Sequence, residues 1–243
     1  MAEVMIFSPH PDDAELGMGG TIARLIAQGV GVALVDVTSG EPTPYGDEAT
    51  RAAETAGANL ALGSPQRENL GLPNRWLEET IENRKLLAAA IRRHRPRILF
   101  IPYALDAHPD HLALHVLATK SRFDAQLTHS DIPGEPHRVE RIVHFYCTHL
   151  RLAIVPTFLV DISAHAQAKR KAIDAYQSQF YAHRPHPGEL PDMVMQTCAY
   201  FGSRAGVRYA EPFHTDEPIL VSDLGTIGPG GAGAGARAGE NRK

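Results

Sequence analysis

Hydrophobic positions along the first half of the chain alternate between short apolar runs and longer amphipathic segments. Short apolar runs are typical of buried strands, and apolar residues recurring at helical spacing are typical of helices. The predicted strands are Val4–Phe7, Val32–Val37, Arg67–Leu70, Arg97–Pro102, Ile142–Cys147 and Phe158–Val160. The predicted helices are Gly17–Gln28, Glu48–Leu62, Glu78–His94, Leu112–Phe123 and Ala164–Phe180.

Strands that alternate with helices in this way predict an α/β fold. We expect a Rossmann-like, mostly parallel sheet with helices on both faces, arranged in three layers. Residues 1–227 are expected to form a single domain, in which Ala182–Pro191 is a surface loop rich in proline and histidine. The Gly/Ala-rich segment 228–243 is expected to be a disordered tail.

Composition and charge exclude several classes of protein. The hydrophobic fraction of 43% and the charged fraction of 21% are those of a globular chain. The net charge of −4 lacks the basic footprint of a nucleic-acid-binding protein. No apolar run reaches the roughly 18 residues of a membrane span, and the N-terminus does not resemble a signal peptide. With only two cysteines, Cys147 and Cys198, the sequence predicts a cytoplasmic location.

The segment after the first strand, SPHPDDAELGMGG, is glycine-rich and invites comparison with a dinucleotide-binding loop. That fingerprint is GxGxxG, and here the position three residues after Gly19 is Ile22. The sequence therefore does not predict a dinucleotide site.

Two histidine–aspartate motifs follow predicted parallel strands. His10-Pro11-Asp12-Asp13 comes after the first strand, and His108-Pro109-Asp110-His111 comes after the Arg97–Pro102 strand. In open α/β sheets, ligands bind outside the carboxyl ends of the strands. One such motif could simply cap a helix. Two of them at strand ends predict a metal site instead.

The residue types in these motifs match the needs of a metal-dependent hydrolase. His10, Asp13 and His111 offer two imidazoles and a carboxylate, a set that suits zinc with a fourth position left for water. Asp12 could accept a proton from that water. A protonated His108, oriented by Asp110, could stabilise an oxyanion or donate a proton to a leaving amine.

Two other functions fit part of this pattern. Two histidines and a carboxylate also describe the facial triad of non-haem Fe(II) oxygenases, so ligand type alone leaves both Zn²⁺ and Fe²⁺ open. A non-catalytic sugar- or metal-binding module would lack the base and the acid that Asp12 and His108 provide. The other histidines are interpreted as surface, loop or packing residues, among them His149 and His186, and the two cysteines as inert core residues.

At these motifs the sequence resembles the PIG-L (LmbE-like) deacetylase family. The resemblance extends over ELGMGGTIARLIAQG, the Arg51-Ala52-Ala53-Glu54 helix, AYQSQF and GVRYAEPF. It is strongest to the bacillithiol-biosynthesis branch, which deacetylates N-acetylglucosaminyl malate. The resemblance implies a zinc-dependent deacetylase of an N-acetyl sugar conjugate, with chitobiose-like or inositol-linked sugars as alternatives, and a homo-oligomer (trimer or hexamer).

The resemblance also implies a role for each motif residue. His10, Asp13 and His111 correspond to the metal ligands and Asp12 to the general base. His108 and Asp110 correspond to the charged acid pair. Two further residues are implied in substrate binding, namely Arg51 and Tyr209. One departure is Ala107, which stands where members of the bacillithiol branch often have an arginine for the malate carboxylate.

Overall fold

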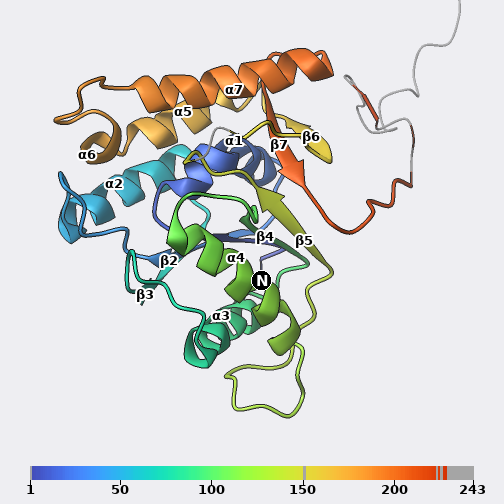
Figure 1. Cartoon of the computed structure of the whole chain (residues 1–243). Helices are drawn as coiled ribbons and strands as arrows, with labels where there is room; N and C mark the ends of the chain where they lie inside the picture. The colour runs from blue at the N-terminus through green and yellow to red at the C-terminus, as the bar shows by residue number, and fades with distance from the viewer. Residues whose placement is uncertain (1, 150–151, 223, 225–226, 229–243) are drawn as a thin grey trace, which may run out of the picture.

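The computed structural model contains one seven-stranded sheet enclosed by helices on both faces (Figure 1). The structure describes residues 2–149, 152–222, 224, 227 and 228. For this part of the chain the predicted α/β fold is confirmed. The predicted tail, 228–243, lies outside the described residues except for Gly228.

The sheet is parallel over five strands and antiparallel at one side. Its strands are β1 (Val4–Ser8), β2 (Val32–Thr38), β3 (Gln66–Leu72), β4 (Ile98–Pro102), β5 (Arg141–Phe145), β6 (Phe158–Asp161) and β7 (Ala210–His214). They lie in the order β3-β2-β1-β4-β5-β7-β6. Strands β1 to β5 run parallel, whereas β7 runs antiparallel to both β5 and β6.

Helices cover both faces of this sheet. They are α1 (Asp13–Ala27), α2 (Glu48–Ala61), α3 (Ile81–His94), α4 (Pro109–Asp124), α5 (Ala166–Asp174), α6 (Gln177–Phe180) and α7 (Glu189–Ala205). Helices α3 and α4 lie on one face, and α1, α2, α5 and α7 on the other (Figure 1). Among the described helices, none combines the length and the apolar character that crossing a membrane requires.

Residues of β1 show how the strands are buried on both sides. Met5 and Phe7 pack in the core beneath α3 and α4, whereas Val4 and Ile6 pack in the core beneath α1 and α5. Alternate side chains of a strand point to opposite faces of its sheet. Because helices cover both faces, the strand is apolar throughout rather than alternating.

Two helices begin earlier than the sequence predicted. Helix α1 starts at Asp13 rather than Gly17, and α4 starts at Pro109 rather than Leu112. Both histidine–aspartate motifs thus form helix N-termini as well as strand-end loops. Pro109 suits the first position of α4 because proline has no N–H, and the N–H of that position has no partner within the helix.

The C-terminal third differs most from prediction. The predicted helix Ala164–Phe180 is two helices, α5 and α6, separated at Ala175 and Tyr176. Helix α7 and strand β7 were not predicted, and the loop expected over Ala182–Pro191 gives way to helix at Glu189. Pro191 made this segment read as loop, yet proline is tolerated in the first turn of a helix.

Candidate metal centre and active site

The two motifs meet because their strands are neighbours. Strands β1 and β4 pair in parallel, with Ile6 opposite Phe100, so the segments that follow them emerge side by side. His10 lies in the turn between β1 and α1, and His108 is the N-cap of α4. The imidazole rings of His10 and His108 lie edge to face, with an interplanar angle of 66° and their centroids 4.7 Å apart. The two motifs are therefore in contact.

Three donor atoms from the motifs form a small triangle. Asp13 Oδ2 lies 3.0 Å from His10 Nδ1 and 3.1 Å from His111 Nε2, and the two imidazole nitrogens are 3.3 Å apart. Zinc at about 2.0–2.1 Å from tetrahedrally arranged ligands holds them about 3.3 Å apart. The triangle therefore has the size that a tetrahedral zinc ion requires, and all three side chains are at least 90% buried.

A second carboxylate stands behind each of these histidines. Asp110 Oδ2 lies 2.9 Å from His10 Nε2, and Asp106 Oδ2 lies 2.9 Å from His111 Nδ1. A carboxylate that accepts the outer N–H of an imidazole fixes the tautomer whose other nitrogen can bind a metal. Asp106 was not predicted from the sequence, although it stands only two residues before the second motif.

Asp110 therefore has a different partner from the one expected. The sequence predicted that its carboxylate contacts His108, whereas in the structure it contacts His10 and accepts from the backbone N–H groups of Arg75 and Leu77. Its own N–H donates to His108 Nδ1 at 3.2 Å. The reason is the helical turn at Pro109, which points the Asp110 side chain back beneath the first motif.

The electrostatics of the triangle favour positive charge. Burial by itself would lower the pKa of His10, but Asp110 and Asp13 raise it to about 9. Burial also opposes ionisation of His111, yet Asp13 and Asp106 hold its pKa well above the ordinary value. Burial would raise the pKa of Asp13, but the two imidazoles keep it well below its usual range. Such surroundings stabilise a bound cation.

Asp12 is held in an unusual backbone conformation next to this triangle. Its φ of 124° lies in a region that residues other than glycine rarely adopt, and such strain concentrates at functional sites. Arg51 Nη1 donates to Asp12 Oδ2 at 2.9 Å and to Pro11 O at 2.7 Å, and Arg51 Nε donates to Glu41 at 3.1 Å. Burial raises the pKa of Asp12 to about 7, against the opposing charge of Arg51.

The surroundings of His108 favour the neutral form of its imidazole. Burial, together with the charges of His10 and His111, lowers its pKa to about 4. Because His108 Nδ1 accepts the Asp110 N–H, the proton of the neutral ring lies on Nε2. A neutral His108 can donate a hydrogen bond from Nε2, and its role as an acid stays a prediction.

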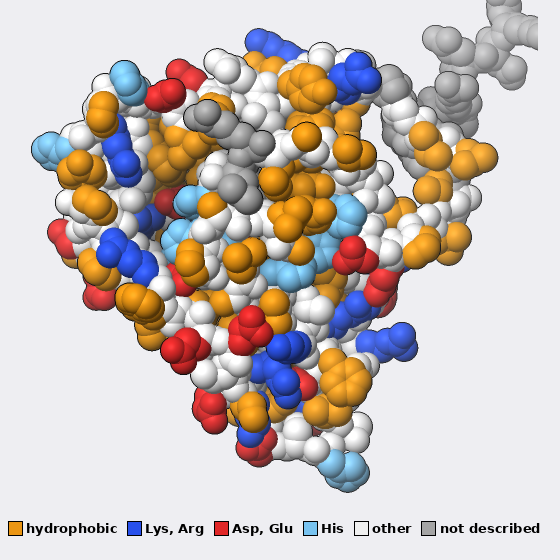
Figure 2. Space-filling view, in the orientation of Figure 1, with side chains coloured by type: hydrophobic (Ala, Val, Ile, Leu, Met, Phe, Trp, Pro, Cys, Tyr) orange, Lys and Arg blue, Asp and Glu red, His pale blue; other side chains and the backbone are white. Residues whose placement is uncertain are grey.

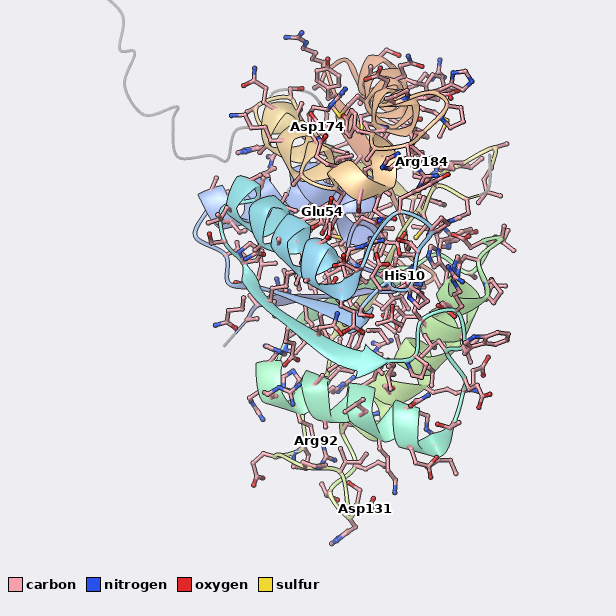
Figure 3. The ribbon with its side chains drawn as sticks, turned by 90° about the vertical axis from the view of Figure 1, so that its left-hand side faces the viewer. His10, Glu54, Arg92, Asp131, Asp174 and Arg184 are labelled. Atoms are coloured by element: carbon pink, nitrogen blue, oxygen red, sulfur yellow. The ribbon has the colours of Figure 1, made fainter. Side chains whose placement is uncertain are left out.

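A cavity of about 600 Å³ opens over these groups. His10, Asp12, Asp13, Arg51 and His108 all line it. Figure 2 shows histidine side chains gathered near the middle of one face, and Figure 3 shows His10 and Arg184 on the same side of the molecule. The rest of the wall includes Asn74, Arg75, His149, Arg184, His186 and Glu189.

Two further residues differ in their relation to the cavity. His149 is exposed, as expected for a surface residue, but it also lines the cavity, with its ring 4.9 Å from that of His111. Tyr209, expected near the substrate, lies just before β7 and does not line the cavity. Its carbonyl accepts from Ile162 N at 3.0 Å. No sequence motif marks His149, because its loop reaches the site only through the fold.

His111 also belongs to other sets of side chains that could bind a metal. Besides the triangle of His10, Asp13 and His111, three further groups of described side chains bring one donor atom each within 4.8 Å of one another, and every group contains His111. They are His10 with His108, Asp13 with His149, and Asp106 with Cys147. His111 is thus the common point of the candidate metal centre.

Known proteins resemble this chain over most of its length. A family model described as PIG-L, GlcNAc-PI de-N-acetylase, matches residues 5–121. A diacetylchitobiose deacetylase of Thermococcus kodakarensis is 31% identical over 231 residues, covering 86% of this chain and 81% of the relative. The crystal structure of the conserved protein TT1542 from Thermus thermophilus superposes with a TM-score of 0.84 at 39% identity, covering 91% of this chain and 97% of the other.

A further relative acts on an inositol-linked sugar. It is a 1D-myo-inositol 2-acetamido-2-deoxy-alpha-D-glucopyranoside deacetylase of Mycobacteroides abscessus, 26% identical over 225 residues, covering 72% of this chain and 81% of the relative. Fold, site and relatives place the chain among the α/β amide hydrolases. It belongs to the PIG-L family of N-deacetylases.

Proposed function

We propose that this N-deacetylase is zinc-dependent and removes the acetyl group from an N-acetylglucosamine conjugate. The observation that carries the proposal is the triangle of His10, Asp13 and His111 donor atoms, 3.0–3.3 Å apart and backed by Asp106 and Asp110. Its size supports zinc, and the named activities of the relatives support an acetamido sugar as substrate.

The residues around the triangle have complementary roles in amide hydrolysis. When bound, zinc supplies a Lewis acid that polarises the amide carbonyl and lowers the pKa of water to about 7. Asp12, which lines the cavity beside Asp13, accepts the proton of the attacking water. Arg51 holds the Asp12 carboxylate in place through the 2.9 Å ion pair.

His108 would stabilise the negative charge that develops on the carbonyl oxygen. Its Nε2–H is the free donor of the ring, because Nδ1 is occupied by the Asp110 N–H. A neutral donor placed where an oxyanion forms lowers the barrier without needing to be protonated beforehand. The proton taken up by Asp12 can then pass to the leaving amine.

For the finer substrate we propose N-acetylglucosaminyl malate or a similar anionic conjugate. Ala107 is exposed and supplies no charge for a carboxylate. Arg75 and Arg184 line the cavity instead, and they support an acidic group on the part of the substrate that is not the sugar. Chitobiose-like and inositol-linked sugars are the neutral alternatives.

The test is acetate release from three substrates by the metal-free and the zinc-loaded protein. The substrates are N-acetylglucosaminyl malate, diacetylchitobiose and the inositol-linked N-acetylglucosamine, and the His111→Ala variant is the control without a site. We expect zinc-dependent release, fastest from the malate conjugate. Release from a neutral sugar instead would retain the deacetylase and reject the anionic substrate.

Two other results would contradict the zinc assignment. Full activity after complete removal of metal would reject a metal mechanism altogether. Oxygen consumption with Fe²⁺ and a 2-oxo acid, without acetate release, would favour the oxygenase chemistry that the same ligand types allow.

A further inference from the structure

Helix α1, which carries the ligand Asp13 at its first position, is broken one turn later. Met18 has φ −147° and ψ 21°, which is not helical, and it separates the turn Asp13–Gly17 from the remainder of the helix. Met18 is fully buried, so solvent does not satisfy the interrupted backbone. In an unbroken α-helix, the Gly20 N–H would donate to the Leu16 carbonyl.

A buried ion pair occupies this break. Lys169 Nζ, from α5, donates to Leu16 O at 2.7 Å, and Glu211 Oε1, from β7, accepts from Gly20 N at 2.9 Å. Lys169 and Glu211 are themselves 2.6 Å apart and both are fully buried. The pair therefore bonds to both groups that the break in α1 separates.

The second oxygen of Glu211 extends the same arrangement. Glu211 Oε2 accepts from Thr21 N at 2.7 Å and from Thr21 Oγ1 at 2.6 Å. Burial by itself would lower the pKa of Lys169, but the charge of Glu211 raises it above the ordinary value, so the lysine stays charged. The bonds that Glu211 accepts from Gly20 and Thr21 act as the N-cap of the second part of α1.

Two glycines of the LGMGG segment, Gly17 and Gly20, allow α1 to pack closely against Phe145 and Ile162. A Cβ atom on Gly17 would lie 2.5 Å from Phe145 Cδ2, and one on Gly20 would lie 2.7 Å from Ile162 Cδ1. Side chains at these positions would push α1 away from the elements that it packs against. The glycines that invited comparison with a dinucleotide-binding loop thus allow close packing around the break in α1.

A second polar network anchors the short turn from its other side. Glu15, in the middle of Asp13–Gly17, lies 2.6 Å from Arg67 Nη1 and 2.9 Å from the Tyr176 hydroxyl. The turn that bears Asp13 is therefore fixed at Glu15 and at Leu16. Asp13 itself remains directed toward His10 and His111.

Stability alone is a weak reason for such an ion pair. Burying two charges carries a large desolvation cost, and apolar replacements of buried pairs are often neutral or stabilising. We infer that Lys169 and Glu211 are positioning residues of the metal centre: by bridging the break in α1 they set the direction of the Asp13 carboxylate. This inference rests on the metal site of the proposed function.

The test removes the pair and compares metal binding with a matched control. The Lys169→Met/Glu211→Leu double variant deletes both charges. Thr21→Val is the mild variant, which deletes one hydrogen bond to Glu211 and leaves both charges. Arg92→Met is the control, because Arg92 is a buried cation that bonds backbone carbonyls of the loop after α4, far from His10 (Figure 3).

Two readouts separate positioning from general destabilisation. Co²⁺ binding, followed by visible absorption, reports affinity and ligand geometry. We expect the double variant to bind Co²⁺ at least about tenfold more weakly with an altered spectrum, as for residues behind metal ligands. Thr21→Val should weaken Co²⁺ binding by about threefold and alter the spectrum in the same direction. If the double variant does not fold, Thr21→Val alone tests whether the pair positions Asp13. Arg92→Met should lose stability but keep the wild-type affinity and spectrum.

Hydrogen exchange of the metal-free proteins provides the second readout. Amides of residues 13–21 should exchange faster in the pair variants and not in Arg92→Met. Wild-type Co²⁺ affinity and spectrum in the pair variants, or an equal loss in Arg92→Met, would overturn the inference. If the wild-type chain binds neither Co²⁺ nor Zn²⁺, the proposed function fails, and unchanged exchange in the pair variants would then reject the inference on its own.

Discussion

The parallel sheet has one edge formed by the amino ends of its strands and one formed by their carboxyl ends. Both edges have ion pairs of similar length, but the surroundings of these pairs differ strongly. At the amino ends of β1, β4 and β5, Arg97 lies 3.1 Å from Glu3 and 3.3 Å from Glu140, and all three side chains are at least half exposed. At the carboxyl ends of β1 and β4, Asp13 lies 3.0 Å from His10 and 3.1 Å from His111, and these side chains are almost fully buried.

The difference teaches that distance alone does not measure the importance of a charged contact. In water the Coulomb energy of such a pair is about 1 kcal/mol, and it rises several-fold where the surroundings exclude solvent. Buried charges must also be matched by partners, whereas exposed ones need none. The carboxyl edge, where His10, Asp12, Asp13, Arg51 and His108 line one cavity, is therefore where substitutions should alter function.

The largest effect is expected at Asp12, within the carboxyl edge. Asp12→Asn removes the proton acceptor and keeps a side chain of nearly the same size and shape. We expect kcat for acetate release to fall about 10³-fold, or about 4 kcal/mol, with zinc content unchanged. Asp131→Asn, the same substitution at an exposed position far from His10 (Figure 3), should leave kcat unaltered. Retention of more than about a tenth of wild-type kcat would reject Asp12 as the base.

The sequence was sufficient to predict that His10, Asp13 and His111 lie together, and their role as metal ligands stays a prediction. His10, Asp13 and His111 stand in two motifs after parallel strands, and adjacent parallel strands bring such segments together. The burial and spacing of these residues then follow from the fold. The parallel half of the sheet was predicted largely because β1, β2 and β4 are nearly continuous apolar runs.

The sequence was not sufficient to predict the partners of these candidate ligands or the strand β7, although it did predict β6 as Phe158–Val160. The partner of Asp110 depends on where the helix α4 starts, which hydrophobic spacing does not define. His149 carries no motif. Strand β7 contains Glu211 and Pro212, residues that argue against a strand. It nevertheless pairs with β5 and β6, and Lys169 is the buried partner of Glu211. The oligomeric state, the cytoplasmic location and the domain bounds stay predictions.

A smaller effect is expected for the carboxylates behind the ligands. Asp110→Asn and Asp106→Asn should each weaken zinc binding by about 10- to 100-fold, because the amide no longer orients the ligand imidazole. Competition with a chromophoric chelator measures this affinity. If Asp110→Asn lowered kcat and left the zinc affinity intact, Asp110 would act through His108, as the sequence suggested, and not through His10.

The smallest effect is expected at the opposite edge. Arg97→Gln breaks both ion pairs of the amino edge and leaves Glu3 and Glu140 near each other. Because all three side chains are exposed, the free energy of unfolding should fall by less than about 1 kcal/mol, measured by urea denaturation. The loss should shrink in 1 M salt, where screening extends over only about 3 Å, and kcat should not change. A loss of kcat in Arg97→Gln would mean that β1 and β4 transmit strain along their length to the metal centre, and the two edges could then no longer be treated as independent.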